Sequence, residues 1–399
     1  MRSASARGRC ARHRSTPPAR RRTGLGGDGG RGALATADRG ARCRGGRAVN
    51  IAALRKAQEL CEFCPKMCRF SCPVSEATAR ESLTPWGKVS LAALSLGRPE
   101  GPAAMAFAGC TGCHRCAVYC AHDNDVPAIL YAARASAVRS GVAPAAWTEL
   151  PARFSLRGHG EKEDLAAMRA SLPKSEGAAL LFAGCDALAL DGEEARDALF
   201  VARQLGAPLG LAPENALCCG LKLLEGGHPE LAEAHGTRVR SAMAGRKPLH
   251  LVFLQPGCAG FVQERWPLPQ GSQVEHITSY LARALAAVPE RSRPPPLEGG
   301  AVFHDPCALA RDLQELTAPR ALLAAALRGE VREPPRSGLD TSCCGAAGLL
   351  RETMPEVALQ LARERRAELG EEMVTSSPAC AAALGAAEVV SLLKRWLAQ

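Results

Sequence analysis

Two stretches of the sequence, A-A-L-L-F-A-G-C at residues 178–185 and A-V-F-H-D-P-C at residues 301–307, decide the fold. Each is a short apolar run that predicts a buried β-strand, and each ends at a cysteine. A Cys-Cys-Gly triplet follows each run, at residues 218–220 and again at residues 343–345. The chain therefore repeats a strand and its cysteines in the same order.

The rest of each copy repeats as well. Leu251–Leu254 runs into Pro256-Gly257-Cys258, and Met373–Thr375 runs into Pro378-Ala379-Cys380. A helix is expected to begin at Pro229-Glu230 in the first copy and at Pro355-Glu356 in the second. Short apolar strands that alternate with helices predict two parallel α/β units. The cysteines then lie at strand ends and helix starts, where ligands commonly bind.

Two denser cysteine groups precede the repeat, separated by a helical stretch at residues 74–109. They are Cys61, Cys64, Cys68 and Cys72, and then Cys110, Cys113, Cys116 and Cys120. In paired motifs of this kind, the fourth cysteine typically ligates the cluster of the other group. The expected ligand sets are Cys61, Cys64, Cys68 and Cys120 for one [4Fe–4S] cluster, and Cys110, Cys113, Cys116 and Cys72 for the other.

Zinc is the alternative metal for these eight thiols. Zinc ribbons usually pair two C-x2-C knuckles across a dozen or more residues. Four cysteines within residues 61–72, and four within residues 110–120, fit that spacing poorly. A zinc scaffold would also be colourless, which separates the two interpretations.

The net charge of +10 suggests a nucleic-acid partner, but its distribution does not. Residues 1–48 hold 13 Arg, two Asp and no Lys or Glu, so the rest of the chain carries a net charge of about −1. This Arg- and Gly-rich tail has almost nothing to bury, so we expect it to be disordered or to reflect a start assigned too early. No apolar segment long enough to span a bilayer is found, and no nucleic-acid partner is expected.

No export signal is recognised, so the cysteines are expected to be thiols in a reducing compartment. The adjacent cysteines of the repeats can reach different irons of one cluster, and the glycine allows close backbone approach. The candidate ligands are Cys185, Cys218, Cys219 and Cys258 in the first copy, and Cys307, Cys343, Cys344 and Cys380 in the second. Buried, inert cysteines are the other explanation, but three matched positions repeated in order disfavour it.

With His304-Asp305-Pro306-Cys307, these repeats resemble the tandem CCG domains of the heterodisulfide reductase family. Relatives include the iron–sulfur subunits of glycolate oxidase, anaerobic glycerol-3-phosphate dehydrogenase and lactate-utilisation complexes. The fuller family pattern ends in C-x2-C, and Phe261 and Ala383 replace the last cysteine here. Four cysteines per repeat favour an ordinary cluster in one or both repeats over the five-cysteine cluster of the disulfide-reducing enzymes.

The resemblance implies an iron–sulfur electron-transfer subunit of an oxidoreductase. Its partner would be a flavoprotein dehydrogenase or another redox subunit, and its acceptor a quinone, a disulfide or a membrane-bound carrier. Cys307, Cys343, Cys344 and Cys380 are the candidate reactive cysteines. The location expected is the cytoplasm or the inner face of the membrane. A redox sensor without turnover is the alternative function.

The expected fold is α plus α/β, with a helical ferredoxin-like domain followed by the two α/β CCG units. The predicted divisions are a tail (1–48), the ferredoxin-like domain (49–140), a linker (141–177), repeat 1 (178–290), a Pro-rich linker (291–299) and repeat 2 (300–399). Two further residue types are interpreted as structural. His304 is a candidate ligand or proton donor, but it is expected to cap a loop instead. Arg363, Arg365 and Arg366 are expected to form a solvated helix face.

Overall fold

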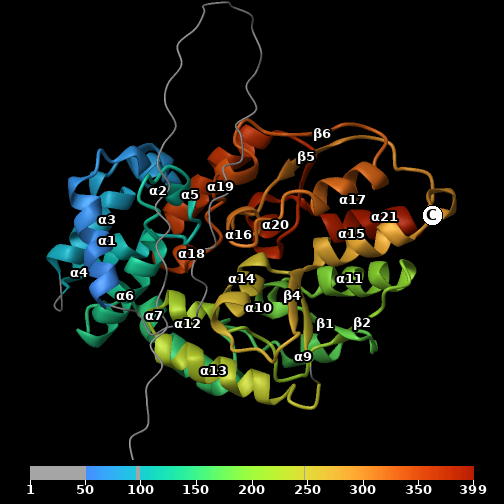
Figure 1. Cartoon of the computed structure of the whole chain (residues 1–399), viewed down its shortest axis with the longest axis horizontal. Helices are drawn as coiled ribbons and strands as arrows, with labels where there is room; N and C mark the ends of the chain where they lie inside the picture. Colours follow the sequence, from blue (N-terminus) through green and yellow to red (C-terminus); the bar gives the residue numbers. More distant parts are fainter. Residues whose placement is uncertain (1–50, 96–98, 247) are drawn as a thin grey trace, which may run out of the picture. The chain divides into compact units, whose positions relative to one another are not determined.

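The two repeats fold into sheets of the same design (Figure 1). The computed structural model describes residues 51–95, 99–246 and 248–399, and the predicted tail lies outside them. The strand orders are β2-β1-β3-β4 and β6-β5-β7-β8, and every pairing is parallel. The mixed helical and α/β architecture with two parallel sheets is therefore confirmed.

The elements of repeat 1 alternate between strands and helices. They are β1 (Ala179–Phe182), α10 (Gly184–Ala189), α11 (Glu193–Gln204), β2 (Leu209–Leu211), α12 (Leu221–Glu225), α13 (Pro229–Ser241), β3 (His250–Phe253), α14 (Pro256–Arg265), β4 (Gln273–His276) and α15 (Ile277–Ala287). The central strands β1 and β3 are apolar, and Leu180 pairs in register with Leu251. Buried apolar runs of this kind are typical of parallel sheets covered on both faces.

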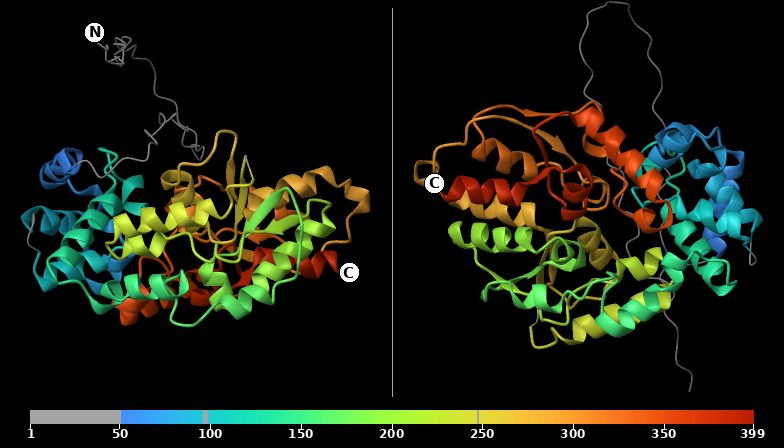
Figure 2. Two further views of the ribbon diagram at one scale, coloured as in Figure 1. Left: turned by 90° about the horizontal axis from the view of Figure 1, so that it is seen from below. Right: turned by 180° about the vertical axis from the view of Figure 1, so that it is seen from behind.

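Repeat 2 follows a 3₁₀ turn, η3 (Glu290–Ser292), and the Pro-rich segment. Its elements are β5 (Ala301–His304), α16 (Cys307–Arg311), α17 (Ala318–Ala326), β6 (Val331–Arg332), η4 (Gly338–Asp340), α18 (Leu350–Thr353), α19 (Pro355–Leu369), β7 (Met373–Thr375), α20 (Pro378–Leu384), β8 (Ala387–Glu388) and α21 (Val389–Leu397). Helices α11 and α21 lie side by side, as do α15 and α17, so the repeats pack through these helices (Figure 2).

The segment before the repeats is helical. It contains α1 (Ile51–Phe63), η1 (Met67–Ser71), α2 (Pro73–Thr78), η2 (Glu81–Leu83), α3 (Pro85–Leu94), α4 (Gly101–Ala108), α5 (Arg115–Val118) and α6 (Val126–Arg139). The predicted helix start at Pro85 is confirmed, because the Thr84 side chain accepts a hydrogen bond from the Gly87 N–H at 3.1 Å. Helix α3 packs against α1, α4 and α6.

Residues 141–177, which the sequence suggested to be a linker, contain three short helices. These are α7 (Ala145–Thr148), α8 (Leu150–Arg157) and α9 (Ala166–Ala170). Trp147 and Leu150 are fully buried, and Phe154 is nearly so. Helix α8 packs on α12 of repeat 1, so this stretch contributes to the core. Where one domain ends and the next begins remains a prediction.

Candidate functional site

The first cysteine group begins with Cys61 in the last turn of α1, continues through Cys64 and through Cys68 in η1, and ends with Cys72 before α2. Lys66 adopts a left-handed conformation, and its N–H points at the Cys64 sulfur at 3.2 Å. The Asn124 side chain, which precedes α6, donates to the Cys61 sulfur at 3.2 Å, and its backbone N–H lies 3.4 Å from the Cys120 sulfur. Asn124 therefore connects Cys120 with the first group.

The thiols of Cys61, Cys64, Cys68 and Cys120 influence one another. Burial raises the pKa of Cys68 to about 12, and the negative charge of the other three thiolates adds to that rise. Such mutual repulsion would be relieved by a shared cationic iron centre, because metal ligation requires the thiolate form. The structure thus brings the four residues of the first predicted ligand set together, and their assignment as ligands stays a prediction.

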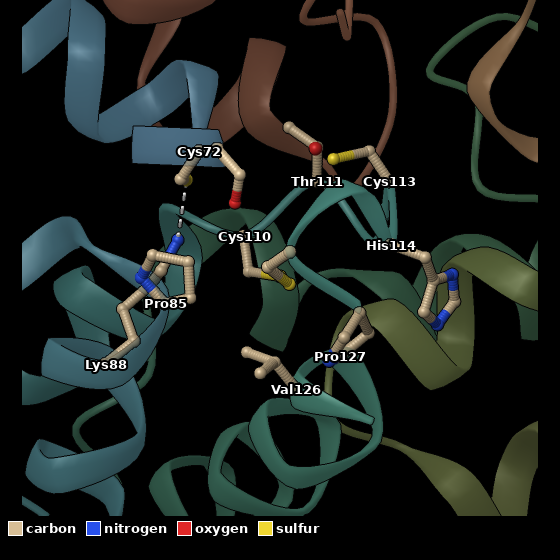
Figure 3. Close-up of a pocket in the computed structure, with 11 residues that line it drawn as sticks. Cys72, Pro85, Lys88, Cys110, Thr111, Cys113, His114, Val126 and Pro127 are labelled. Atoms are coloured by element: carbon tan, nitrogen blue, oxygen red, sulfur yellow. Dashed lines mark hydrogen bonds between the residues drawn. The ribbon is translucent and has the colours of Figure 1, made fainter. Parts of the chain in front are cut away.

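The second predicted set lines a pocket of about 310 Å³, part of which is open to solvent (Figure 3). Cys110 and Cys113 enter it from the loop between α4 and α5, Cys116 enters from α5 itself, and Cys72 enters from the start of α2. Burial raises the pKa of Cys116 well above its ordinary value, and the charges of Cys113, Cys110 and Cys72 raise it further. Cys72 is thereby placed with the second group, across 38 residues of sequence.

Lys88 projects into the same pocket from α3 and is only 2% exposed. Its Nζ lies 3.5 Å from the Cys72 sulfur and 2.9 Å from the Gly109 carbonyl oxygen (Figure 3). Burial lowers the pKa of Lys88, but the charges of Cys72, Cys110 and Cys116 outweigh that effect and raise it. No carboxylate of the described residues pairs with this ammonium. A buried cation requires a compensating anion, and a thiolate-bound iron–sulfur cluster, which is anionic, fits that requirement.

In repeat 1 the cysteines gather beyond the carboxyl ends of β1 and β3. The Cys185 and Cys218 sulfurs lie 3.6 Å apart, and the Cys219 and Cys258 sulfurs lie 3.2 Å apart. All four are buried. Gly220 has a φ of 96°, a conformation that a side chain would strain, so the glycine permits the turn from the two adjacent cysteines into α12.

Repeat 2 builds the same arrangement from Cys307, Cys343, Cys344 and Cys380. The Cys344 and Cys380 sulfurs are 3.4 Å apart, and the neighbouring Cys307 raises the pKa of Cys343. Gly345 repeats the left-handed turn, with a φ of 84°. The sixteen predicted cysteines therefore fall into four groups, all free thiols.

The second ferredoxin-type group meets repeat 2 directly. The neighbouring thiol of Cys343, together with burial, raises the pKa of Cys113 well above its ordinary value. Gly348, which lies just beyond the Cys-Cys-Gly turn, approaches the Cys110 carbonyl so closely that a Cβ would lie 2.6 Å from it. The two loops are thus packed backbone to backbone.

Charged side chains fix this junction. The buried Arg311 of α16 donates to the Cys113 carbonyl, and also to the Leu339 and Thr341 carbonyls at 2.9 and 3.0 Å. Arg115 donates to both carboxylate oxygens of Asp340, at 3.0 and 3.2 Å. Such bidentate pairs define orientation as well as add energy. The junction was not foreseen, because it joins loops more than 200 residues apart.

Two expectations about single residues were wrong. His304 does not cap a loop; it ends β5, is 1% exposed, and lies beside Cys344 and Cys380. Arg365 is also buried at 1% exposure and donates to His304, whereas Arg363 and Arg366 are exposed as expected. The spacing held a signal for Arg365, because it lies four residues after Leu361 and four before Leu369, on the buried face of α19.

Lys88 and Arg311 were not identified as site residues from the sequence. Lys88 is the single charged residue of α3, which is otherwise apolar apart from Ser90, and that isolation is the signal that could have drawn attention to it. Arg311 ends a short helix that starts at a predicted ligand, but nothing local shows what it would contact.

A family of known proteins shares these features. The cysteine-rich CCG domain matches residues 179–263 and again residues 301–385. The chain is 27% identical over 274 residues to the D subunit of the dihydromethanophenazine:CoB–CoM heterodisulfide reductase of Methanosarcina barkeri, covering 64% of this chain and 66% of the relative. It is 25% identical over 273 residues to the corresponding protein of Methanosarcina mazei, with the same coverage.

A third relative is the B subunit of the fumarate reductase (CoM/CoB) of Methanothermobacter marburgensis, 25% identical over 260 residues and matched over 64% of this chain and 51% of the relative. The chain spans 66% of the two Methanosarcina relatives, slightly less than two thirds of their length. Its cysteine groups, its two parallel sheets and the two domain matches agree with one another. The chain therefore contains two cysteine-rich CCG domains and is related to the iron–sulfur D subunit of heterodisulfide reductase.

Proposed function

We propose that the chain is the electron-relay subunit of an oxidoreductase and that its four cysteine groups hold the redox centres. The ferredoxin-type sets would be Cys61, Cys64, Cys68 and Cys120, and Cys110, Cys113, Cys116 and Cys72, each on a [4Fe–4S] cluster. One or two further clusters would be held by Cys185, Cys218, Cys219 and Cys258, and by Cys307, Cys343, Cys344 and Cys380. A bound cluster would supply one-electron transfer at each position.

The observation that carries this proposal is the close packing of the Cys110–Cys113 loop on the Cys-Cys-Gly loop of repeat 2, where a Cβ on Gly348 would lie 2.6 Å from the Cys110 carbonyl oxygen. The loops of two different ligand sets meet there, and Arg311 and the Arg115–Asp340 pair hold these loops together. A sensor needs one centre whose loss alters a contact, whereas a relay needs neighbouring centres in a fixed order. The arrangement supports electron transfer between the first and the second ferredoxin-type set, and between the second set and repeat 2.

A redox partner would approach at the first set. Cys64 and Cys68 are only partly buried, and the same turn presents Phe63, Met67 and Phe70 at 87%, 64% and 78% exposure. Exposed apolar side chains beside a redox site are suited to a protein contact. We propose a flavoprotein dehydrogenase for this partner, which would oxidise a small organic acid or thiol.

The acceptor would meet the chain at the CCG half, and a quinone, a disulfide or another carrier is proposed. Among the described residues no helix has both the length and the apolar character needed to cross a bilayer. A membrane-bound acceptor would therefore be reached by peripheral contact of this part of the chain with the inner face of the membrane.

The test is the metal content and electron capacity of the anaerobically purified protein. We expect a brown protein with roughly eight iron and matching sulfide from the ferredoxin-type sets alone, and additional iron from the repeats. A relay should also take up electrons from a chemical reductant and release them to an added quinone or dye over many cycles. Stoichiometric zinc without visible absorption would refute the proposal, and uptake without release would indicate a sensor instead.

A further inference from the structure

The two CCG sites differ at the residue that ends their first strand. In repeat 2 this residue is His304, at the carboxyl end of β5, and in repeat 1 it is Phe182, at the carboxyl end of β1. A ring nitrogen of His304 and the sulfurs of Cys344 and Cys380 all lie within 4.8 Å of one another. Phe182 instead stacks on Phe253, with 4.9 Å between ring centroids.

Arg365 fixes the tautomer of His304. Its Nε donates to His304 Nδ1 at 3.1 Å, and a guanidinium can only donate. Nδ1 must therefore carry the lone pair, which places the proton of the neutral ring on Nε2. Arg365 cannot easily turn away, since it also donates to the Arg336 carbonyl at 2.9 Å and pairs with Glu368 at 2.7 Å.

The Nε2–H of His304 is fully buried and makes no hydrogen bond with any of the described residues. A buried donor left without an acceptor costs free energy. The groups it can reach are the sulfurs. The sulfurs of Cys344 and Cys380 both lie within 4.8 Å of a ring nitrogen of this histidine.

We propose that His304 is a tuning residue, whose Nε2–H donates to a sulfur of the second CCG site and raises its reduction potential above that of the first. A hydrogen bond to sulfur favours the more negative, reduced form of a cluster. The same tautomer excludes His304 as an iron ligand, because ligation at Nε2 would need the lone pair that its proton occupies. The inference rests on the proposed function, since it presumes a cluster in repeat 2.

The test is an EPR-monitored redox titration of the full-length, anaerobically purified protein and its variants. Cys343→Ser identifies the signal of repeat 2 by difference. His304→Phe introduces the residue of repeat 1 and removes the donor, whereas His304→Gln keeps an acceptor for Arg365 and a donor for sulfur. His235→Phe is the matched control, because His235 is equally buried but its Nε2 donates to the Cys218 carbonyl at 2.9 Å.

At the wild-type midpoint of the repeat 2 signal, His304→Phe should lower the ratio of reduced to oxidised site about tenfold, which is about 59 mV for a one-electron couple. His304→Gln should keep the reduction potential of the repeat 2 signal close to its wild-type value. His235→Phe should leave that potential unchanged. If His304→Phe retained the signal and the iron and its reduction potential were unchanged, the inference about His304 would be overturned but the proposed function would not. A strong ¹⁵N hyperfine coupling from a coordinated His304 would overturn it as well. Failure of Cys343→Ser to remove any signal would instead contradict the proposed function.

Discussion

The two CCG repeats share a sheet order and four cysteine positions, yet their surroundings are almost opposite. Three charged residues of repeat 1 have apolar counterparts in repeat 2. Conversely, two apolar residues of repeat 1 correspond to a histidine and an arginine in repeat 2. The corresponding pairs are Asp186 and Ala308, Lys222 and Ala347, Glu225 and Leu350, Phe182 and His304, and Ala189 and Arg311. Duplication has preserved the ligand frame, while the residues around it have diverged.

These differences separate the sites by role. In repeat 1, Lys222 is neutralised by Glu161 and by Asp186 at 2.9 Å, so the cation is already paired. In repeat 2, Arg311 is engaged by backbone carbonyls of the junction, and His304 faces the sulfurs. Repeat 2 thus has both the contact to the ferredoxin-type half and the donor that would raise its potential. A matched fold therefore does not predict a matched function.

The strongest way to break this comparison is to remove one repeat at a time. Cys343→Ser should eliminate the repeat 2 centre and lower the rate of acceptor reduction by roughly 10- to 100-fold, because a hard hydroxyl replaces a soft thiolate at the junction. Cys218→Ser should eliminate only the repeat 1 centre. The measurement is rapid-freeze EPR with an acceptor assay.

The two variants should also differ in how fast the remaining centres are reduced. In Cys218→Ser, repeat 2 should still be reduced at the wild-type rate through Cys113. In Cys343→Ser, repeat 1 should be reduced slowly, because the Cys110–Cys113 loop packs on the Cys-Cys-Gly loop of repeat 2. Equal rates in both variants would show that the junction does not set the order of transfer.

A smaller effect is expected from the buried cation of the ferredoxin-type half. Lys88→Met should move the potential of the second ferredoxin-type centre to more negative values by about 60 mV, since a hydrogen bond from a charged group contributes about 1.5 kcal/mol and 1.4 kcal/mol is tenfold. An EPR redox titration measures it, with the exposed Lys56→Met as the matched control. A shift of equal size in Lys56→Met would show that only net charge matters.

The smallest effect concerns Glu225, an ionisable group that repeat 2 replaces by Leu350. Burial raises the pKa of Glu225 to about 7, and Arg134 and Lys222 offset this only in part. Because an unfolded glutamate titrates near about 4.3, the folded protein binds this proton more tightly. The free energy of unfolding should therefore be highest below about pH 4.3 and decrease as the pH rises to about 7.

Glu225→Gln should remove that decrease. Relative to wild type, its thermal midpoint should rise at pH 8, by about 2–4 °C for each kcal/mol, and should change less at pH 5. Differential scanning fluorimetry at the two pH values measures this. If the thermal midpoints of Glu225→Gln and wild type differed equally at both pH values, Glu225 would not titrate in this range. The control is Glu233→Gln, because Glu233 is an exposed residue of α13.

The sequence predicted the elements whose patterns are local. The central strands β1, β3, β5 and β7 are short apolar runs, and each was located to within a residue or two. The outer strands were missed, because they are two to four residues long and β4, Gln273–His276, is mostly polar. Such strands form because they pair with a neighbouring strand of the sheet. This pairing depends on the tertiary structure, and the local sequence does not show it.

The candidate sites divide in the same way. Cysteine spacing identified the groups, because a ligand loop is a local feature. Arg365 and His304 were misjudged because each polar residue, taken alone, is usually solvated or structural; only together do they bury each other's polar atoms. The junction at Cys113 and Cys343 has no local signature at all.

The anchoring by Arg311 has a consequence for the evolution of this junction. Its guanidinium binds the main-chain carbonyls of Cys113, Leu339 and Thr341, a group that every amino acid possesses. Substitutions at positions 339 and 341 would therefore leave the acceptors in place, and selection would act on the arginine alone. Covariation between positions would carry little trace of this contact, even where homologous chains preserve it.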